Sequence, residues 1–133
     1  PAQIFMGDVG SISLGFFLGF LLLSLAAKGY WSAAMILPLY FVLDSTLTLF
    51  RRLLRGDRIW RPHRMHFYQI GSKNGLGPGR VCCALFLHNI LLIATALYAT
   101  HTETSITPLI VATSISIILL WYLGAPRDHL ENV

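Results

Sequence analysis

The sequence predicts an all-α membrane protein: a polytopic helix bundle with four transmembrane helices and a basic cytoplasmic loop between the second and the third. Three observations predict this class. Hydrophobic residues make up 55% of the 133 residues and charged residues only 12%, whereas a soluble domain carries about 25% charged residues. Four nearly uncharged stretches approach the ~20 residues that a helix needs to cross the hydrocarbon core. Finally, the Lys and Arg residues gather in one segment between two of these stretches.

The uncharged stretches define the expected spans, which are about residues 11–27, 31–50, 81–100 and 105–123. The first span has Ser11, Gly15 and Gly19 at four-residue spacing, and such a stripe of small residues lets another helix approach closely in lipid. The second span contains one charged residue, Asp44, and also Pro38. Because proline removes a backbone donor and crowds the preceding turn, we expect this helix to be kinked.

The positive charges predict the orientation in the membrane. Eight of the ten Lys and Arg residues lie in the segment 51–80, whereas Lys28 alone lies between the first two spans. Cytoplasmic loops hold the excess of Lys and Arg, so the 51–80 loop and both ends of the chain are predicted to be cytoplasmic. The loop is expected to begin as a helix at 49–55 and to end in a glycine-rich, flexible turn at 71–79.

The first candidate site lies where the chain enters the first span. Asp8 stands between Gly7 and Gly10 at the predicted membrane boundary, and glycines let the backbone approach a ligand closely. A carboxylate there, beside Ser11 and the backbone donors of a helix N-terminus, suits Mg²⁺ and the phosphates that it carries. The alternative is that Asp8 and Ser11 only cap the helix, because both residue types are preferred caps. The residues alone leave both interpretations open.

The second candidate site lies in the basic loop, between Arg61 and Gln69. If this segment is helical, His63 and His66 lie on one face with Arg64 beside them. Arginine matches phosphate oxygens and stabilises the charge that shifts in phosphoryl transfer. One alternative is a loop that only sets the topology and contacts anionic lipid heads. A zinc site is the other, and it lacks credible third and fourth ligands.

Polar residues inside the spans have weaker claims to a function. Asp44 is an ionisable group within a span, which favours a functional role. It also shares a helix face with Thr48 and lies two turns before Arg51, so a structural pairing stays open. His88 and Asn89 in the third span are expected to form hydrogen bonds between helices. A single charged residue within the spans is little for an ion or proton path, which disfavours a transporter or channel.

The two candidate sites together resemble those of a known family. Residues 5–15, Phe-Met-Gly-Asp-Val-Gly-Ser-Ile-Ser-Leu-Gly, resemble the F-M-G-D-x-G-S-x-x-L-G signature of the polyprenyl-phosphate N-acetylhexosamine-1-phosphate transferases, the membrane phospho-sugar transferases of glycosyltransferase family 4. Residues 49–56 and 63–69 resemble a later cytoplasmic loop of the family. Their form is similar to that of the enzymes that initiate O-antigen and enterobacterial common antigen. It departs from the consecutive histidines of the phospho-N-acetylmuramoyl-pentapeptide transferase. The chain therefore resembles the C-terminal part of such an enzyme.

This resemblance implies a reaction and a set of site residues. The expected reaction transfers a sugar-1-phosphate, N-acetylhexosamine-1-phosphate by this resemblance, from a UDP-sugar to undecaprenyl phosphate. UMP is released, and cell-envelope polysaccharide synthesis, such as that of lipopolysaccharide O-antigen, begins. The resemblance implies that Asp8 binds Mg²⁺, with Mn²⁺ as the alternative ion, and that Asp8, His63 and His66 are catalytic. The implied substrate-binding residues are Gly7, Gly10, Ser11, Arg61, Arg64 and Gln69.

The resemblance also implies partners and a location. The expected partners are a UDP-sugar, undecaprenyl phosphate and membrane lipid, and a homodimer stays open. No nucleic-acid partner is expected, because the topology explains the basic run. The expected location is the bacterial inner membrane, with the active site on the cytoplasmic side. Family members carry a pair of adjacent aspartates on earlier loops, and this sequence has no such pair. The 133 residues alone are therefore expected to be inactive. The competing interpretation is a noncatalytic membrane module that binds polyprenyl phosphate or a partner protein.

Overall fold

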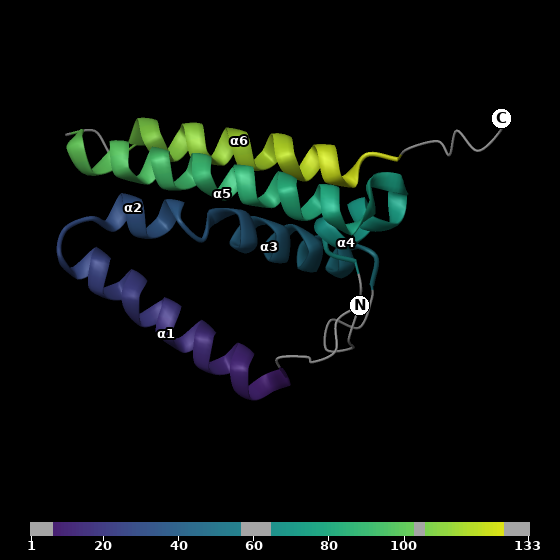
Figure 1. Cartoon of the computed structure of the whole chain (residues 1–133), viewed down its shortest axis with the longest axis horizontal. Helices are drawn as coiled ribbons and strands as arrows, with labels where there is room; N and C mark the ends of the chain where they lie inside the picture. The colour runs from purple at the N-terminus through teal and green to yellow at the C-terminus, as the bar shows by residue number, and fades with distance from the viewer. Residues whose placement is uncertain (1–6, 57–64, 103–105, 127–133) are drawn as a thin grey trace, which may run out of the picture.

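The computed structural model describes residues 7–56, 65–102 and 106–126, and all regular structure in these ranges is helical. The predicted site residues Arg61, His63 and Arg64 lie outside the described residues. Figure 1 shows the elements in chain order, which are α1 (Gly7–Ala27), α2 (Trp31–Ile36), α3 (Leu39–Leu54), α4 (Phe67–Gly71), the wide turn η1 (Ser72–Leu76), α5 (Gly77–His101) and α6 (Ile106–Gly124).

Within the described ranges, three helical stretches are long and apolar enough to cross a membrane, namely Gly7–Ala27, Phe67–His101 and Ile106–Gly124. The second of these joins α4, η1 and α5. The protein is therefore an all-helical, multi-pass membrane protein, as the sequence predicts. The predicted number of four continuous spans is not reached, because the expected second span is divided between α2 and α3, and each of these is too short to cross on its own.

Pro38 separates α2 from α3. Its backbone (φ −86°, ψ 1°) leaves the helical region, and it has no N–H with which to continue the ladder of α2. The predicted kink is therefore a full break, after which the chain begins a new helix at Leu39. α3 then continues past the expected span end to Leu54, with Arg51 and Arg52 in its last turn, where cations interact favourably with the exposed carbonyl ends of the helix.

The glycine-rich segment 71–79, where the sequence predicts a turn, contains a kink between α4 and α5, because Asn74, Gly75 and Gly77 leave the helical region. Gly75 and Gly77 have φ values of +87° and +72°, a left-handed conformation that glycine adopts without steric cost. Pro78 stands in the first turn of α5, where its missing N–H would have no helical partner in any case. The residues that predict a turn thus form a kinked connection that directs the chain from α4 into α5.

The core lies where α2 and the start of α3 meet α5 and α6. Figure 1 shows α5 and α6 side by side and antiparallel. Ile36 and Tyr40 from the broken pair are fully buried, together with Leu92 of α5 and Leu123 of α6. Small side chains allow close helix approach in this core, and the buried alanines are Ala33, Ala34, Ala96, Ala99 and Ala112.

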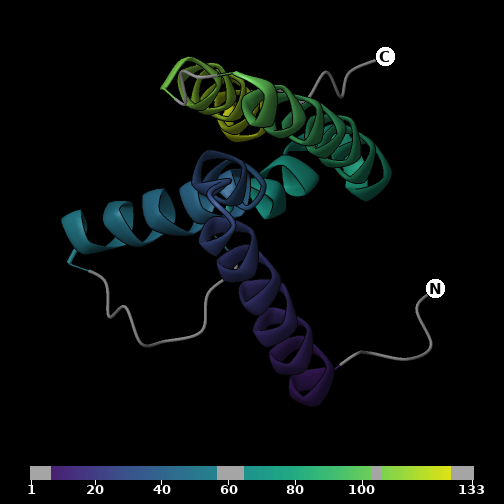
Figure 2. The same ribbon diagram turned by 90° about the vertical axis from the view of Figure 1, so that its left-hand side faces the viewer.

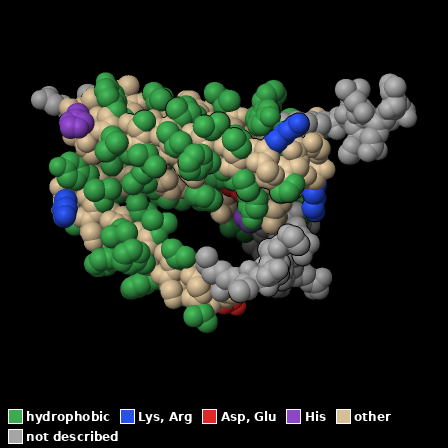
Figure 3. Space-filling model, viewed as in Figure 1, with side chains coloured by type: hydrophobic (Ala, Val, Ile, Leu, Met, Phe, Trp, Pro, Cys, Tyr) green, Lys and Arg blue, Asp and Glu red, His purple; other side chains and the backbone are tan. Residues whose placement is uncertain are grey.

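Helix α1 packs against this core near its C-terminal end, through Leu25. None of its residues is buried, and Figure 2 shows α1 and α3 leaving the α5–α6 pair in different directions. Figure 3 shows hydrophobic side chains spread over the helices, with the Lys and Arg side chains in this view lying toward the two ends of the molecule. Such an apolar surface needs lipid or further protein around it. The arrangement therefore positions polar groups at the helix ends and leaves the helix sides for apolar surroundings.

Candidate functional site

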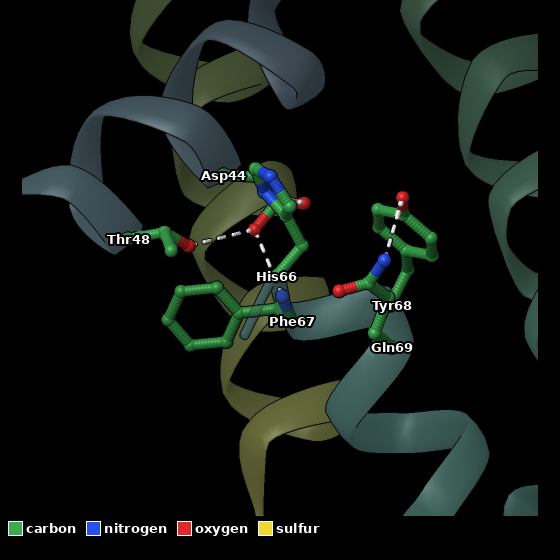
Figure 4. Close-up of polar contacts among 6 residues, drawn as sticks. All are labelled: Asp44, Thr48, His66, Phe67, Tyr68 and Gln69. Atoms are coloured by element: carbon green, nitrogen blue, oxygen red, sulfur yellow. Dashed lines mark hydrogen bonds and ion pairs between the residues drawn. The ribbon is translucent and has the colours of Figure 1, made fainter. Parts of the chain in front are cut away.

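Asp44 of α3 is the centre of a buried polar cluster, drawn in Figure 4. Asp44 is only 2% exposed. The carboxylate oxygen Oδ1 accepts hydrogen bonds from the backbone N–H of Phe67 at 2.9 Å and from the hydroxyl of Thr48 at 3.3 Å. The other oxygen, Oδ2, lies 3.5 Å from Nδ1 of His66. One carboxylate therefore joins α3 to the first residues of α4.

The start of α4 explains why a carboxylate is placed here. The first N–H groups of a helix have no acceptor within the helix, and Asp44 supplies one for Phe67 from 23 positions earlier in the chain. His66 precedes the helix with an extended backbone (φ −65°, ψ 148°), so it does not lie inside a helix as the one-face hypothesis assumes. Its carbonyl accepts the N–H groups of Gln69 and Ile70, each at 3.0 Å. α4 is thus fixed at its beginning.

The end of α3 places cationic side chains beside α4. The guanidinium of Arg51 lies 4.7 Å from the centre of the Phe67 ring, a cation–π contact. Arg51 therefore packs on Phe67 and does not form the suggested pair with Asp44. A small hollow of about 60 Å³ next to it is lined by Thr48, Arg51, Arg52, Arg55, Met65 and Ile70. Guanidinium groups are well suited to phosphate.

The other side of α4 faces a larger cavity of about 450 Å³, lined by Tyr68, Gln69, Ser72, Lys73, Pro78, Val81, Cys82 and Leu85. Pockets for small ligands have volumes of about 300–1,000 Å³. The rings of Tyr68 and His66 are stacked, with their centres 5.7 Å apart. Gln69, a predicted substrate-binding residue, donates from Nε2 to the Tyr68 hydroxyl at 3.3 Å. Its Oε1 is buried without a hydrogen-bond partner among the described residues.

The other predicted site residues lie in the first turn of α1. Gly7 has φ +64°, and Asp8 and Ser11 are exposed. The hydroxyl of Ser11 donates to the backbone carbonyl of Asp8 at 3.2 Å. Figure 1 shows the start of α1 and helix α4 toward the same end of the molecule, with α1 diverging from the other helices. The start of α1 and the described part of the second predicted site thus share one end, and the structure does not bring α1 against α4.

Asp8 presents one exposed carboxylate at the start of α1, and carboxylates are among the ligands that Mg²⁺ takes. Mg²⁺ at phosphate sites keeps several waters and takes one or two carboxylates together with phosphate oxygens. Among the described residues, no group of three His, Cys, Asp or Glu side chains could hold a metal ion by itself. A magnesium ion at Asp8 would therefore need ligands beyond the described side chains.

Sequence reasoning predicts the hydrogen bond of His88 between helices and leaves open the pairing of Asp44 that the structure shows with Thr48. His88 of α5 is buried, and its Nε2 lies 3.1 Å from the hydroxyl of Ser116 in α6, which confirms the expected hydrogen bond between helices. The contact between Asp44 and His66 is not predicted. An ionisable residue within a span indicates that Asp44 has some role. Its partner His66 cannot be predicted from the sequence, because the contact depends on how the fold brings α4 back to α3.

Comparison with known proteins identifies relatives of two kinds. Over 83 residues the chain is 35% identical to the undecaprenyl-phosphate alpha-N-acetylglucosaminyl 1-phosphate transferase of Pasteurella multocida (strain Pm70), covering 56% of this chain and 22% of that protein. It is 27% identical over 101 residues to a probable undecaprenyl-phosphate N-acetylglucosaminyl 1-phosphate transferase of Bacillus subtilis (strain 168), covering 73% of this chain and 28% of the relative. It is 33% identical over 82 residues to the phospho-N-acetylmuramoyl-pentapeptide-transferase of Streptococcus pneumoniae (strain Hungary19A-6), covering 58% of this chain and 24% of that enzyme.

These matches extend over about a quarter of the length of the relatives, with shares of 22%, 28% and 24%. No protein-family model and no solved structure matches the chain. The three relatives are all transferases by name, and they agree with the family that the motifs of residues 5–15 and 49–69 indicate. By sequence, the chain is related to the polyprenyl-phosphate N-acetylhexosamine-1-phosphate transferases.

Proposed function

We propose that this chain is the C-terminal part of an enzyme that transfers N-acetylhexosamine-1-phosphate from a UDP-sugar to undecaprenyl phosphate, releases UMP and so initiates a cell-envelope polysaccharide. The observation that carries the proposal is the match to relatives named as undecaprenyl-phosphate transferases, together with the signature around Asp8. The chain is a multi-pass membrane protein, which suits an acceptor with a long lipid tail.

The proposed reaction exchanges one pyrophosphate link for another. An oxygen of the lipid phosphate forms a bond to the sugar-bearing phosphorus, and the bond from that phosphorus to the bridging oxygen breaks. UMP leaves with the electron pair. Both substrates are anionic, so the protein contributes charge neutralisation and in-line positioning. Because the bonds made and broken are of the same kind, the reaction is expected to be nearly balanced and reversible.

The described residues support this chemistry at one end of the molecule. Arg51, Arg52 and Arg55 line the hollow beside α4, where they would attract phosphate oxygens. His66 stands at the start of α4 with its side chain 26% exposed, so that it can reach a substrate. His63, Arg61 and Arg64 belong to the same predicted set and lie outside the described residues.

In this proposal Asp8 would hold Mg²⁺, which would neutralise charge on the pyrophosphate. Gly7 and Gly10 would let the backbone at the start of α1 lie close to the bound phosphates, and the Ser11 hydroxyl would contact the same groups. The site would then be on the cytoplasmic side of the bacterial inner membrane. The reason is that it includes residues of the basic segment 51–80, and cytoplasmic loops hold the excess of Lys and Arg.

The choice of sugar is the finer part of the proposal. The relatives include acetylglucosaminyl and muramoyl-pentapeptide enzymes at 35% and 33% identity, so overall similarity does not separate them. The segment around His66 departs from consecutive histidines, and this departure favours an N-acetylhexosamine over a muramoyl-pentapeptide. Competition between UDP-N-acetylhexosamines and the UDP-muramoyl-pentapeptide in one assay tests the choice directly.

The experiment that tests the function measures UMP release by membranes that contain the full-length protein, with UDP-N-acetylhexosamine, undecaprenyl phosphate and Mg²⁺ added. Asp8→Asn is compared with Ser13→Ala on the same helix. We expect release that requires both lipid and Mg²⁺, with a loss of about 100-fold or more in Asp8→Asn, because the Mg²⁺ that neutralises the pyrophosphate would lose a carboxylate ligand. Ser13→Ala removes only a bond to the backbone carbonyl of Val9, and we expect a much smaller loss.

Each outcome of this experiment has a distinct meaning. Absence of release by inserted, folded wild-type protein with every UDP-sugar tried would refute the transferase and favour the noncatalytic binding module. Release that is unaffected by Asp8→Asn would keep the reaction and return Asp8 to the role of a helix cap.

A further inference from the structure

We infer that Asp44 is the positioning residue of this site, a buried carboxylate on α3 that holds His66 and the first turn of α4 where the reaction uses them. This inference rests on the proposed function and adds to it a residue that none of the motifs includes. It follows from the contacts of one side chain, from its burial and from the place of α4 between two hollows of the molecule.

The two oxygens of Asp44 have separate tasks. Oδ1 accepts the backbone N–H of Phe67 at 2.9 Å and the Thr48 hydroxyl at 3.3 Å, and so it fixes the backbone at the start of α4. Oδ2 lies 3.5 Å from Nδ1 of His66, and so it faces the imidazole. As Figure 4 shows, Asp44 and Thr48 come from one helix, while His66 and Phe67 come from the other segment.

Asp44 cannot act on the substrate itself. Its side chain is 3% exposed, whereas that of His66 is 26% exposed, so only the histidine can be reached from outside. A buried carboxylate is costly unless hydrogen bonds and an opposite charge compensate it. Here the contacts that compensate it are those that define the position of α4. The carboxylate therefore acts through His66 and the backbone of Phe67.

The contact also restricts the orientation of the imidazole. Oδ2 of Asp44 faces Nδ1 of His66 from one direction. The stacked ring of Tyr68, with its centre 5.7 Å away, limits the rotation of His66 from another direction. A histidine that is held and oriented in this way needs no rearrangement when a substrate phosphate arrives, which is the condition for efficient positioning.

The first test compares Asp44→Asn and Asp44→Ala in the full-length protein. Asn keeps an acceptor for Phe67 but removes the charge that faces His66, whereas Ala removes both. We expect kcat for transfer to fall about 10- to 100-fold in Asp44→Asn and further in Asp44→Ala, with little change in KM for the UDP-sugar. Tyr40→Phe is the matched control, because Tyr40 lies one turn earlier on the same helix, is equally buried, and has a hydroxyl without a hydrogen-bond partner among the described residues.

A double-mutant cycle separates positioning from general stability. If Asp44 acts through His66, then Asp44→Asn has little further effect on kcat once His66→Ala is present. If Asp44 only stabilises the fold, the two losses multiply. Multiplicative losses, or a kcat in Asp44→Asn equal to that of Tyr40→Phe, would overturn the inference.

Hydrogen exchange gives a readout that does not depend on activity. We expect faster amide exchange at residues 66–71 in Asp44→Ala than in wild type, with Tyr40→Phe unchanged, because the Phe67 N–H loses its acceptor. Unchanged exchange in α4 would refute the claim that Asp44 fixes the start of α4. Faster exchange in a protein that transfers no sugar phosphate would instead refute the proposed function and leave the anchor in place, so that the two failures are distinguishable.

Discussion

Gly124, at the end of α6, shows how closely α4 is held. A Cβ atom added at Gly124 would lie 2.9 Å and 3.0 Å from two atoms of the Phe67 ring. A Cβ added at Gly71 would likewise meet Leu123 of α6, at 3.1 Å from a methyl carbon and 3.2 Å from the carbonyl oxygen. α4 therefore fits against α6 only because two glycines lack side chains, and this contact supports the segment that follows His66 in addition to the contact with Asp44.

Gly124→Ala is accordingly predicted to displace the Phe67 ring. We expect a loss of about 1–3 kcal/mol in stability, the usual result of overpacking, together with lower transfer activity. Thermal unfolding in detergent, measured alongside the UMP assay, checks both. Gly79→Ala is the control, because a Cβ there has no atom within 4 Å. Equal melting temperatures for the two variants would show that the ring moves aside at no cost.

At the scale of single residues, the sequence suggests candidate side chains but not their partners. The signature suggests Asp8 as a site residue, and the basic loop suggests His66 and Gln69. The contact of His66 with Asp44 spans 22 positions of the chain and depends on how α4 returns to α3, which no local pattern encodes. Asp44 is recognisable in the sequence only as a charge inside an apolar stretch.

At the scale of elements, one buried hydrogen bond couples α5 to α6. The hydroxyl of Ser116 donates its single proton to the carbonyl of Ala112 at 2.8 Å. At its contact with His88, 3.1 Å away, Ser116 must therefore accept, so His88 carries a proton on Nε2. This pair is fully buried, because Ser116 is 0% and His88 is 4% exposed.

Ser116→Ala is predicted to weaken the α5–α6 pair by about 0.6–1.7 kcal/mol, the range for hydrogen bonds between membrane helices. The reason is that the Nε2 proton of His88 loses its acceptor. Ser114→Ala on the same helix is the matched control, because Ser114 is exposed and its hydroxyl donates only to the carbonyl of Ile110. Steric trapping or denaturant unfolding in detergent measures the difference, and equal stabilities would contradict the coupling.

The helices themselves are largely predictable from the lengths of the uncharged stretches in the sequence. α1, α5 and α6 coincide with three of the expected spans, because long apolar runs must satisfy their backbone groups as helices in lipid. Two features escape the pattern. Pro38 breaks the second span fully, since Tyr40 and the residues after it pack as a separate helix. The glycines at 75 and 77 adopt positive φ values, and composition alone cannot distinguish such a directed kink from a flexible turn.

At the scale of the whole molecule, α1 presents an apolar surface that lipid or further protein must cover. An apolar helix of 21 residues without a single buried position contributes little to a core. The paired aspartates of the resembled family are also absent from the sequence. We predict that the isolated 133 residues, reconstituted with undecaprenyl phosphate and Mg²⁺, release no UMP from a UDP-sugar above a protein-free control. Release at the rate of the full-length protein would contradict this.

The topology of the whole chain depends on the broken pair α2 and α3. These helices have 6 and 16 residues, and at about 1.5 Å per residue they extend for roughly 33 Å in total, close to the ~30 Å of the hydrocarbon core. Together they are therefore long enough for one crossing, although each helix is too short to cross by itself. If they cross, Lys28 and Lys73 lie on opposite sides of the membrane. If they turn back, the two lysines lie on the same side.

Cysteine labelling decides between these topologies. With Cys82 and Cys83 replaced by Ala in the full-length protein, we predict that a membrane-impermeant maleimide labels Lys28→Cys from outside in spheroplasts. Lys73→Cys should be labelled only in inside-out vesicles, because the basic segment 51–80 stays cytoplasmic. Labelling of both after solubilisation in detergent is the control for reactivity. Labelling of both from outside would mean that α2 and α3 do not cross. That result would leave three crossings and place α4, His66 and the arginines of α3 on the opposite side from Asp8, which would remove the single site that the proposed reaction requires.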